Sequence, residues 1–120
     1  MVAVIGASND RRKFGNKAVR AFARQGYDVK PVNPNSVTVE GLPAYPSITD
    51  IAGTIDLVTM YVPPAIGERL LPDIARKQPG ELWVNPGAES DTLLAKAETL
   101  GLHPIVACSI IGAGENPSEF

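Results

Sequence analysis

The feature that most constrains the fold is the segment Val2-Ala3-Val4-Ile5-Gly6-Ala7-Ser8 near the start of the chain. Its first four residues are apolar and mostly β-branched, which predicts a strand buried on both faces, as in a parallel sheet. A Gly-Ala-Ser turn follows, and then a basic segment with helical character. In doubly wound α/β folds, the turn between the first strand and the first helix binds the phosphates of a ligand. The segment therefore predicts such a fold with an anion site at its first loop.

Strand-like and helix-like segments alternate along the rest of the chain. We predict strands at about Val2–Ile5, Asp28–Val32, Leu57–Val62, Glu81–Val84 and Pro104–Ala107, and helices at about Asn16–Gln25, Ile66–Lys77 and Asp91–Leu100. This alternation predicts one α/β domain over residues 1–109, doubly wound and Rossmann-like, with a five-stranded parallel sheet in the order 3-2-1-4-5. We expect residues 110–120 to form a C-terminal tail without regular structure.

Three local signals refine this prediction. Pro72 lies inside the second predicted helix and is expected to kink or restart it. A short strand is expected at Thr38–Glu40. Ser47-Ile48-Thr49-Asp50 has the pattern of a capping box that opens a short helix.

Charge is unevenly distributed along the chain of 120 residues. The net charge is only −2, which argues against a general nucleic-acid binder. Residues 1–30 nevertheless hold seven Lys or Arg and two acids, whereas the remainder holds four basic and eleven acidic residues. This excess of positive charge around the first loop and helix suits a small polyanion, although a solvated helix face explains Lys17, Arg20 and Arg24 equally well.

The sequence predicts a cytoplasmic protein without a membrane segment. No apolar run approaches the roughly 20 residues of a membrane helix, and a strand that begins at Val2 leaves no room for a signal peptide. The single cysteine cannot form an internal disulfide, which fits a reducing compartment.

Turn residues follow all five predicted strands and should meet at one edge of the sheet. The strand ends are Gly6-Ala7-Ser8, Asn33-Pro34-Asn35, Pro63-Pro64, Asn85-Pro86-Gly87 and Cys108-Ser109. One such turn alone is best explained as an ordinary strand end, because Gly, Pro, Asn and Ser are common in turns. Five turns at one edge, with basic residues beside the first, favour a ligand site.

The loop pattern does not match the common nucleotide motifs. A dinucleotide fingerprint has three glycines and an acidic residue after the second strand, whereas this loop keeps only Gly6 and the strand ends at Asn33. A P-loop is absent. An NADP-dependent oxidoreductase remains an alternative, with Lys30 or the arginines as cations, but it needs a catalytic Tyr/Lys or Ser pair, and Tyr61 has no suitable lysine nearby in sequence.

The sequence resembles the CoA-binding domain family, small proteins similar to the CoA-binding half of the succinyl-CoA synthetase α subunit. The matching segments are Val4–Ser8, Gly26–Val29, Pro31–Pro34, Gly41–Ile48, Tyr61–Pro64, Leu82–Glu89 and Cys108. The resemblance implies that coenzyme A is held by Ile5–Ser8, Asn33 and Val84–Pro86. The synthetase has a lysine where this chain has Asn33, so Lys30, Arg11 and Lys13 become the candidate partners of the adenosine 3′-phosphate.

The expected function is non-catalytic binding of coenzyme A, or an acyl-CoA, at the carboxyl edge of the sheet. The predicted binding residues are Gly6, Ala7, Ser8, Arg11, Lys13, Asn33, Val62, Pro63, Asn85 and Pro86. No catalytic or metal-binding group is predicted, because His103 lies at the opposite edge and Cys108 has no visible base. A further alternative is an interaction module for a ligase-like partner, and the tail could support a homodimer.

Overall fold

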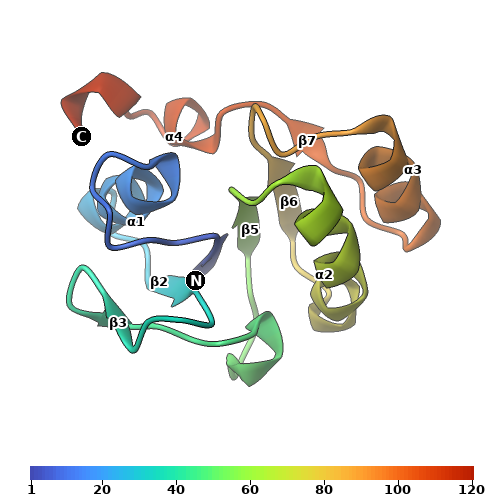
Figure 1. The fold of residues 1–120 in the computed structure, drawn as a ribbon, viewed down its shortest axis with the longest axis horizontal. Coiled ribbons are helices and arrows are strands. Elements are labelled where there is room, and N and C mark those ends of the chain that lie inside the picture. Colours follow the sequence, from blue (N-terminus) through green and yellow to red (C-terminus); the bar gives the residue numbers. More distant parts are fainter.

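The computed structural model describes residues 1–120 and consists of a parallel sheet between two helical layers (Figure 1). The sheet strands are β1 (Val2–Ile5), β2 (Val29–Val32), β5 (Leu57–Met60), β6 (Glu81–Val84) and β7 (Ile105–Val106). The helices are α1 (Phe14–Arg24), α2 (Pro64–Lys77), α3 (Asp91–Thr99) and α4 (Ser109–Gly112). This architecture confirms the predicted α/β fold with a five-stranded parallel sheet.

Side chains of β1 alternate between two separate hydrophobic cores. Val2 and Val4 pack with α1, whereas Ala3 and Ile5 pack with α2 and α3, and none of the four is more than 2% exposed. A strand buried on both faces needs apolar residues at every position, because successive side chains point to opposite faces. The continuous apolar run of this strand is therefore explained by its central place in the sheet.

The predicted order of the strands was wrong in one respect. The observed order is β2-β1-β5-β6-β7, so the third sheet strand lies beside β1 and not outside β2. The connection from β2 to β5 buries Ile48, Ile51 and Ile55 in the core beneath α2 and α3, on the face opposite α1. Right-handed crossovers on opposite faces run in opposite directions across a sheet, so this connection returns past β1. The switch point consequently lies between β1 and β5.

Two small elements occupy the connection between β2 and β5. The hairpin of β3 (Thr38–Val39) and β4 (Leu42–Pro43) contains the short strand expected at Thr38–Glu40. The 3₁₀ helix η1 (Ile48–Asp50) begins with the predicted capping box, in which the Ser47 side chain accepts from the Thr49 N–H and the Asp50 side chain accepts from the Ser47 N–H.

Both long helices begin two residues before their predicted starts. Helix α1 begins at Phe14 and α2 at Pro64. A proline fits the first turn of a helix, because its missing N–H is not needed there. Helix α2 then continues through Pro72 to Lys77, so the expected restart does not occur.

The expectation of an irregular tail over residues 110–120 was also wrong. Helix α4 and the 3₁₀ helix η2 (Pro117–Glu119) lie against α1, as Figure 1 shows near the C-terminus. Ile110 is fully buried in the core beside α1. Arg24 of α1 pairs with Glu115 and Glu119, each at 2.6 Å, and its guanidinium lies over the Phe120 ring. An apolar anchor and ion pairs thus fix this segment.

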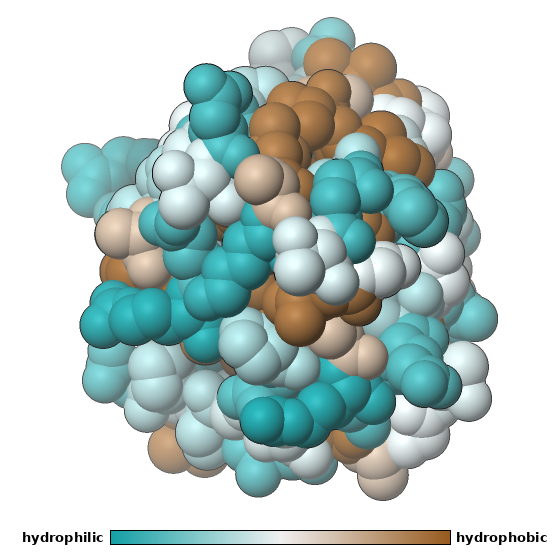
Figure 2. All heavy atoms as spheres, turned by 90° about the vertical axis from the view of Figure 1, so that its right-hand side faces the viewer, coloured by the Kyte–Doolittle hydropathy of each residue, from teal (hydrophilic) through white to brown (hydrophobic).

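Figure 2 shows that hydrophilic side chains cover much of the face on the side of α3, interrupted by a hydrophobic area toward its upper edge.

No helix of the protein combines the length and the apolar character that crossing a bilayer requires.

Candidate functional site

A cleft of about 850 Å³ opens at the carboxyl edge of the sheet, around the ends of β1, β2 and β5. Parallel α/β sheets bind ligands at this edge, beside the point where the strand order reverses. The lining residues come from six short segments and from one face of α2. They are Ile5–Ser8, Lys13–Gly15, Val32–Asn35, Pro46–Ile48, Tyr61–Pro63, Ile66, Leu70, Asp73 and Pro86–Ala88.

The first loop packs tightly against both β5 and α1. Gly6 has a φ of +86°, and a Cβ there would lie 2.7 Å from the carbonyl oxygen of Tyr61. A Cβ on Gly15 would overlap the carbonyl oxygen of Gly6. The two glycines therefore allow the first turn of α1 to approach the end of β1, as the glycines of dinucleotide-binding loops do. The sequence analysis assigned a role only to Gly6, because Gly15 lies nine residues further along the chain.

Two asparagine amides hold the first loop from opposite sides. The Asn16 Nδ2 donates to the Ser8 carbonyl at 2.8 Å, and the Asn33 Nδ2 donates to the Ala7 carbonyl at 2.8 Å. Asn16 is fully buried, and its Oδ1 accepts from the Arg20 Nε at 2.7 Å. These contacts fix the carbonyls of the loop, and the N–H groups of Ala7 and Ser8 donate to no backbone acceptor.

The N-terminus of α1 adds further donors to the same end of the cleft. Phe14 and Gly15 are the first two residues of this helix, and neither N–H donates to a backbone acceptor. Unpaired N–H groups and the helix dipole together favour an anion at this position.

Eight of the ten predicted binding residues line the cleft, and two do not. Those that line it are Gly6, Ala7, Ser8, Lys13, Asn33, Val62, Pro63 and Pro86. The Arg11 Nε instead donates to Glu40 at 2.9 Å, outside the cleft. The Asn85 side chain is buried and donates to Thr59 and to the Met60 carbonyl, while it accepts from the Ser109 N–H. Asn85 therefore holds the ends of β5 and β6 and the start of α4 together.

Lys13 is the one basic side chain that lines the cleft. It is the residue before α1, is exposed, and has no acidic partner within salt-bridge distance. Lys30, another candidate, lies 3.3 Å from Asp28 and over the Tyr45 ring, outside the cleft. The acidic side chain in the lining is Asp73 on α2, which pairs with Arg76.

A smaller hollow of about 550 Å³ lies beside the cleft and shares Phe14, Tyr61 and Pro86 with it. Its other lining residues are Lys17, Asn85, Cys108, Ile111, Asn116, Pro117 and Ser118. Burial raises the pKa of Tyr61 to about 12, and the hydroxyl lies 3.0 Å from that of Ser109. The reductase alternative would need a catalytic Tyr/Lys or Ser pair, and the Tyr61 hydroxyl bonds to a serine, not to a lysine. Cys108 is half-buried and forms no disulfide.

Sequence reasoning missed the parts of the cleft contributed by α2 and by the connection after β4. Ile66, Leu70 and Asp73 share one face of α2 by their spacing of three to four residues, and this periodicity could have revealed them. Pro46 and Ser47 reach the cleft because Tyr45, just before them, pairs with the end of β2. The Tyr45 N–H donates to the Pro31 carbonyl, and the Tyr45 carbonyl accepts from the Asn33 N–H. No local sequence signal predicts that pairing.

His103 and the acidic residues form no metal-binding cluster. His103 is exposed near the start of β7, where its Nδ1 lies 3.0 Å from Glu98. No cluster of three or more His, Cys, Asp or Glu residues is arranged to hold a metal ion.

A family model described as "CoA binding domain" matches residues 1–114. The chain therefore belongs to the CoA-binding domain family, as its resemblance at the sequence level implied. The α subunit of an ADP-forming acetate–CoA ligase of Pyrococcus furiosus is 38% identical over 77 residues, which are 63% of this chain and 17% of that subunit. An ADP-forming acetate–CoA ligase of Archaeoglobus fulgidus is 37% identical over 78 residues, 63% of this chain and 12% of that protein. The chain spans less than a fifth of the length of these relatives.

Solved structures share the whole architecture. A conserved hypothetical protein of Pyrococcus furiosus is 30% identical with a TM-score of 0.85, and the match covers 92% of this chain and 97% of that one. A hypothetical protein of Pyrococcus horikoshii is 27% identical with a TM-score of 0.86, over 93% of this chain and 79% of that one.

Proposed function

We propose that this protein binds coenzyme A, or an acyl-CoA, in the cleft at the carboxyl edge of its sheet, without catalysing a reaction by itself. The observation that carries the proposal is the first loop. Its tight glycine turn, its unpaired N–H groups and the start of α1 lie together at one end of a cleft large enough for a nucleotide. Membership in the CoA-binding domain family supports coenzyme A over other nucleotides.

In this proposal the diphosphate lies against Gly6, Ala7 and Ser8, with Lys13 as its cationic partner. The backbone N–H groups supply fixed donors, and the lysine adds a mobile charge. Val62, Pro63 and Pro86 form a rigid, mostly apolar wall for the rest of the ligand. Asn33 acts by holding the loop carbonyl of Ala7, and Asn85 by joining the surrounding strand ends.

The chemistry of the lining supports non-catalytic binding. A general base or a nucleophile with a neighbouring base is what catalysis on a thioester would require. The charged side chains of the cleft are Lys13 and Asp73, and Asp73 is already paired with Arg76. We therefore assign any chemistry to a ligase-like partner, by analogy with the ligases whose segment this chain resembles. The single free cysteine suits a cytoplasmic setting for such a pair.

Isothermal titration with coenzyme A and acetyl-CoA tests the proposal. The wild-type protein should bind, and Lys13→Gln should bind roughly fivefold more weakly, because an exposed charged contact contributes about 1 kcal/mol. The matched control is Lys96→Gln, an exposed lysine of α3 that does not line the cleft, which should leave the affinity unchanged. Folded protein that gives no heat at millimolar coenzyme A would refute the proposal.

A further inference from the structure

The charge content of the cleft is low for a ligand with two anionic groups. Coenzyme A carries a diphosphate and a separate 3′-phosphate on its adenosine ribose. Among the lining side chains, Lys13 is positive and Asp73 is negative, so the lining is neutral overall. Lys13 lies directly before α1, beside the first loop, and so belongs to the diphosphate end. No second cation lines the cleft for the second anionic group.

The ribose end of the cleft is built from neutral groups. In doubly wound folds the ribose lies at the end of the second strand, which here is β2, followed by Asn33, Pro34 and Asn35. The Asn33 amide is engaged at both ends, because its Nδ2 donates to Ala7 and its Oδ1 accepts from the Asn35 N–H at 2.7 Å. It therefore offers a phosphate at most the second hydrogen of Nδ2, which is a neutral donor and not a cation.

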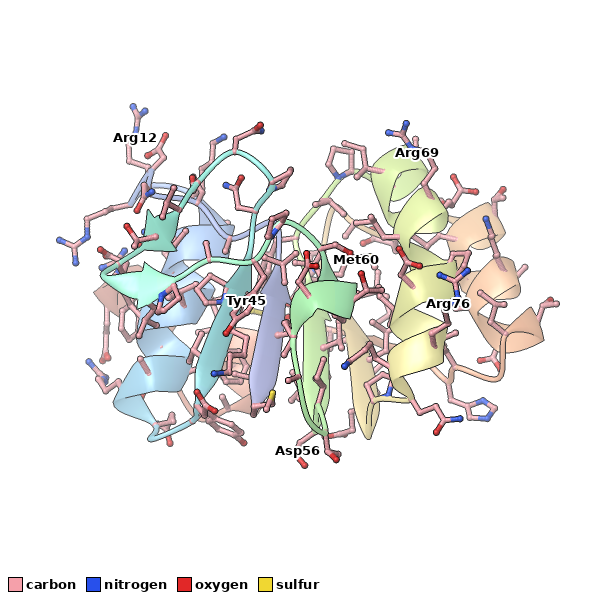
Figure 3. All side chains as sticks on the ribbon, turned by 90° about the horizontal axis from the view of Figure 1, so that it is seen from below. Arg12, Tyr45, Asp56, Met60, Arg69 and Arg76 are labelled. Carbon is pink, nitrogen blue, oxygen red and sulfur yellow. The ribbon has the colours of Figure 1, made fainter.

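The other cations near this edge do not line the cleft, and most of them have acidic partners. Lys17 has none; it lies over the Phe14 ring and lines the smaller hollow. Arg11 pairs with Glu40, and Lys30 pairs with Asp28. Both side-chain hydrogen bonds of Arg12 go to the carboxylate of Asp10, at 3.0 Å each. Figure 3 shows Arg12 and Arg69 at the same upper edge of the molecule, one over each half, with both side chains extending outward. Arg69 has no acidic partner, and it does not line the cleft. A 3′-phosphate would consequently remain largely in water.

We infer that the cleft does not select for the 3′-phosphate, and that its ligand class is the pantetheine esters of adenosine diphosphate, with or without that group. This inference rests on the proposed function and concerns the specificity of the same site. The phosphate gains no cation from the lining of the cleft, so it adds little to the affinity.

Titration of the wild-type protein with coenzyme A and 3′-dephospho-coenzyme A at the same ionic strength tests the inference. We expect dephospho-coenzyme A to bind within about threefold of coenzyme A, or more tightly. If coenzyme A binds more than tenfold more tightly, the inference is overturned while the proposed function stands. If neither ligand binds to folded protein, both are overturned.

A gain-of-charge variant provides a second test at the ribose end. Asn35 lines the cleft, is exposed, and its side chain makes no hydrogen bond, so Asn35→Lys should preserve the fold. We expect about fivefold tighter binding of coenzyme A and unchanged binding of dephospho-coenzyme A. The control Thr99→Lys adds the same charge at the last residue of α3, outside the cleft, and should change neither. An equal gain for both ligands with Asn35→Lys would overturn the placement of the ribose and with it the inference.

Discussion

At the scale of single residues, Gly15 joins the fold to the candidate site. Its backbone lies so close to Gly6 that a methyl group would overlap a backbone carbonyl, which cannot move aside as a flexible side chain does. We predict that Gly15→Ala lowers the free energy of unfolding by about 2–3 kcal/mol and weakens coenzyme A binding, because the displaced carbonyl belongs to the first loop. Urea denaturation and isothermal titration measure the two effects.

Gly26→Ala is the comparison for this change. Gly26 has a φ of +89°, and a Cβ there would meet no atom within 4 Å, so the cost is backbone strain of about 1 kcal/mol. It lies beyond the end of α1, away from the cleft, and coenzyme A affinity should stay at the wild-type value. Equal losses of affinity in the two variants would show that the effect of Gly15→Ala is only a general loss of stability.

Much of the first loop could be predicted from the sequence, because the strand, the turn and the basic helix are contiguous. The partners of its polar side chains could not be. Arg11 was expected at the phosphate, but its partner Glu40 comes from the β3–β4 hairpin, 29 residues later. The hydrogen bonds that link Asn16 to Ser8 and to Arg20 could not be predicted either. An asparagine inside a helix gives no sequence signal of the residue to which its side chain bonds.

At the scale of elements, α4 shows how a four-residue helix can anchor a segment. Ile110 is fully buried against α1, whereas its neighbour Ile111 is 63% exposed. We predict that Ile110→Ala costs about 2–4 kcal/mol of stability, while Ile111→Ala changes it by less than about 0.5 kcal/mol. The free energies of urea unfolding of the two variants provide the measurement, and similar values for both would contradict the packing of α4.

The sequence could not predict this segment or the order of the strands, for two different reasons. The tail is rich in Gly, Pro and Glu, and a single helical turn is too short to show periodicity. The strand order depends on which face the connection after β2 covers. Ile48, Ile51 and Ile55 decide this by packing beneath α2, but their spacing is the same for either face.

At the scale of the whole molecule, the cleft lies around the carboxyl ends of β2, β1 and β5. Strand β7 is at the opposite end of the sheet from β2, with α3 beside it (Figure 1). We predict that saturating coenzyme A slows backbone hydrogen exchange most at residues 6–8, 14–15, 33 and 35, and least at α3 and β7. A bound ligand suppresses local opening mainly where it contacts the chain, whereas its effect on global unfolding is shared by all elements. Mass spectrometry of peptides after timed exchange measures this, and protection confined to α3 and β7 would contradict the site.

The side-chain amides of Asn16 and Asn33 affect the entropy of ligand binding, because they hold the first loop in place. Because they hold the carbonyls of Ser8 and Ala7, the loop keeps its curvature whether or not an anion is present. Little chain entropy is then lost on that side when a nucleotide arrives, and the entropic cost of association falls mainly on the ligand's own rotatable bonds. Shortening the pantetheine arm should therefore alter the entropy of complex formation more than any stiffening of this loop.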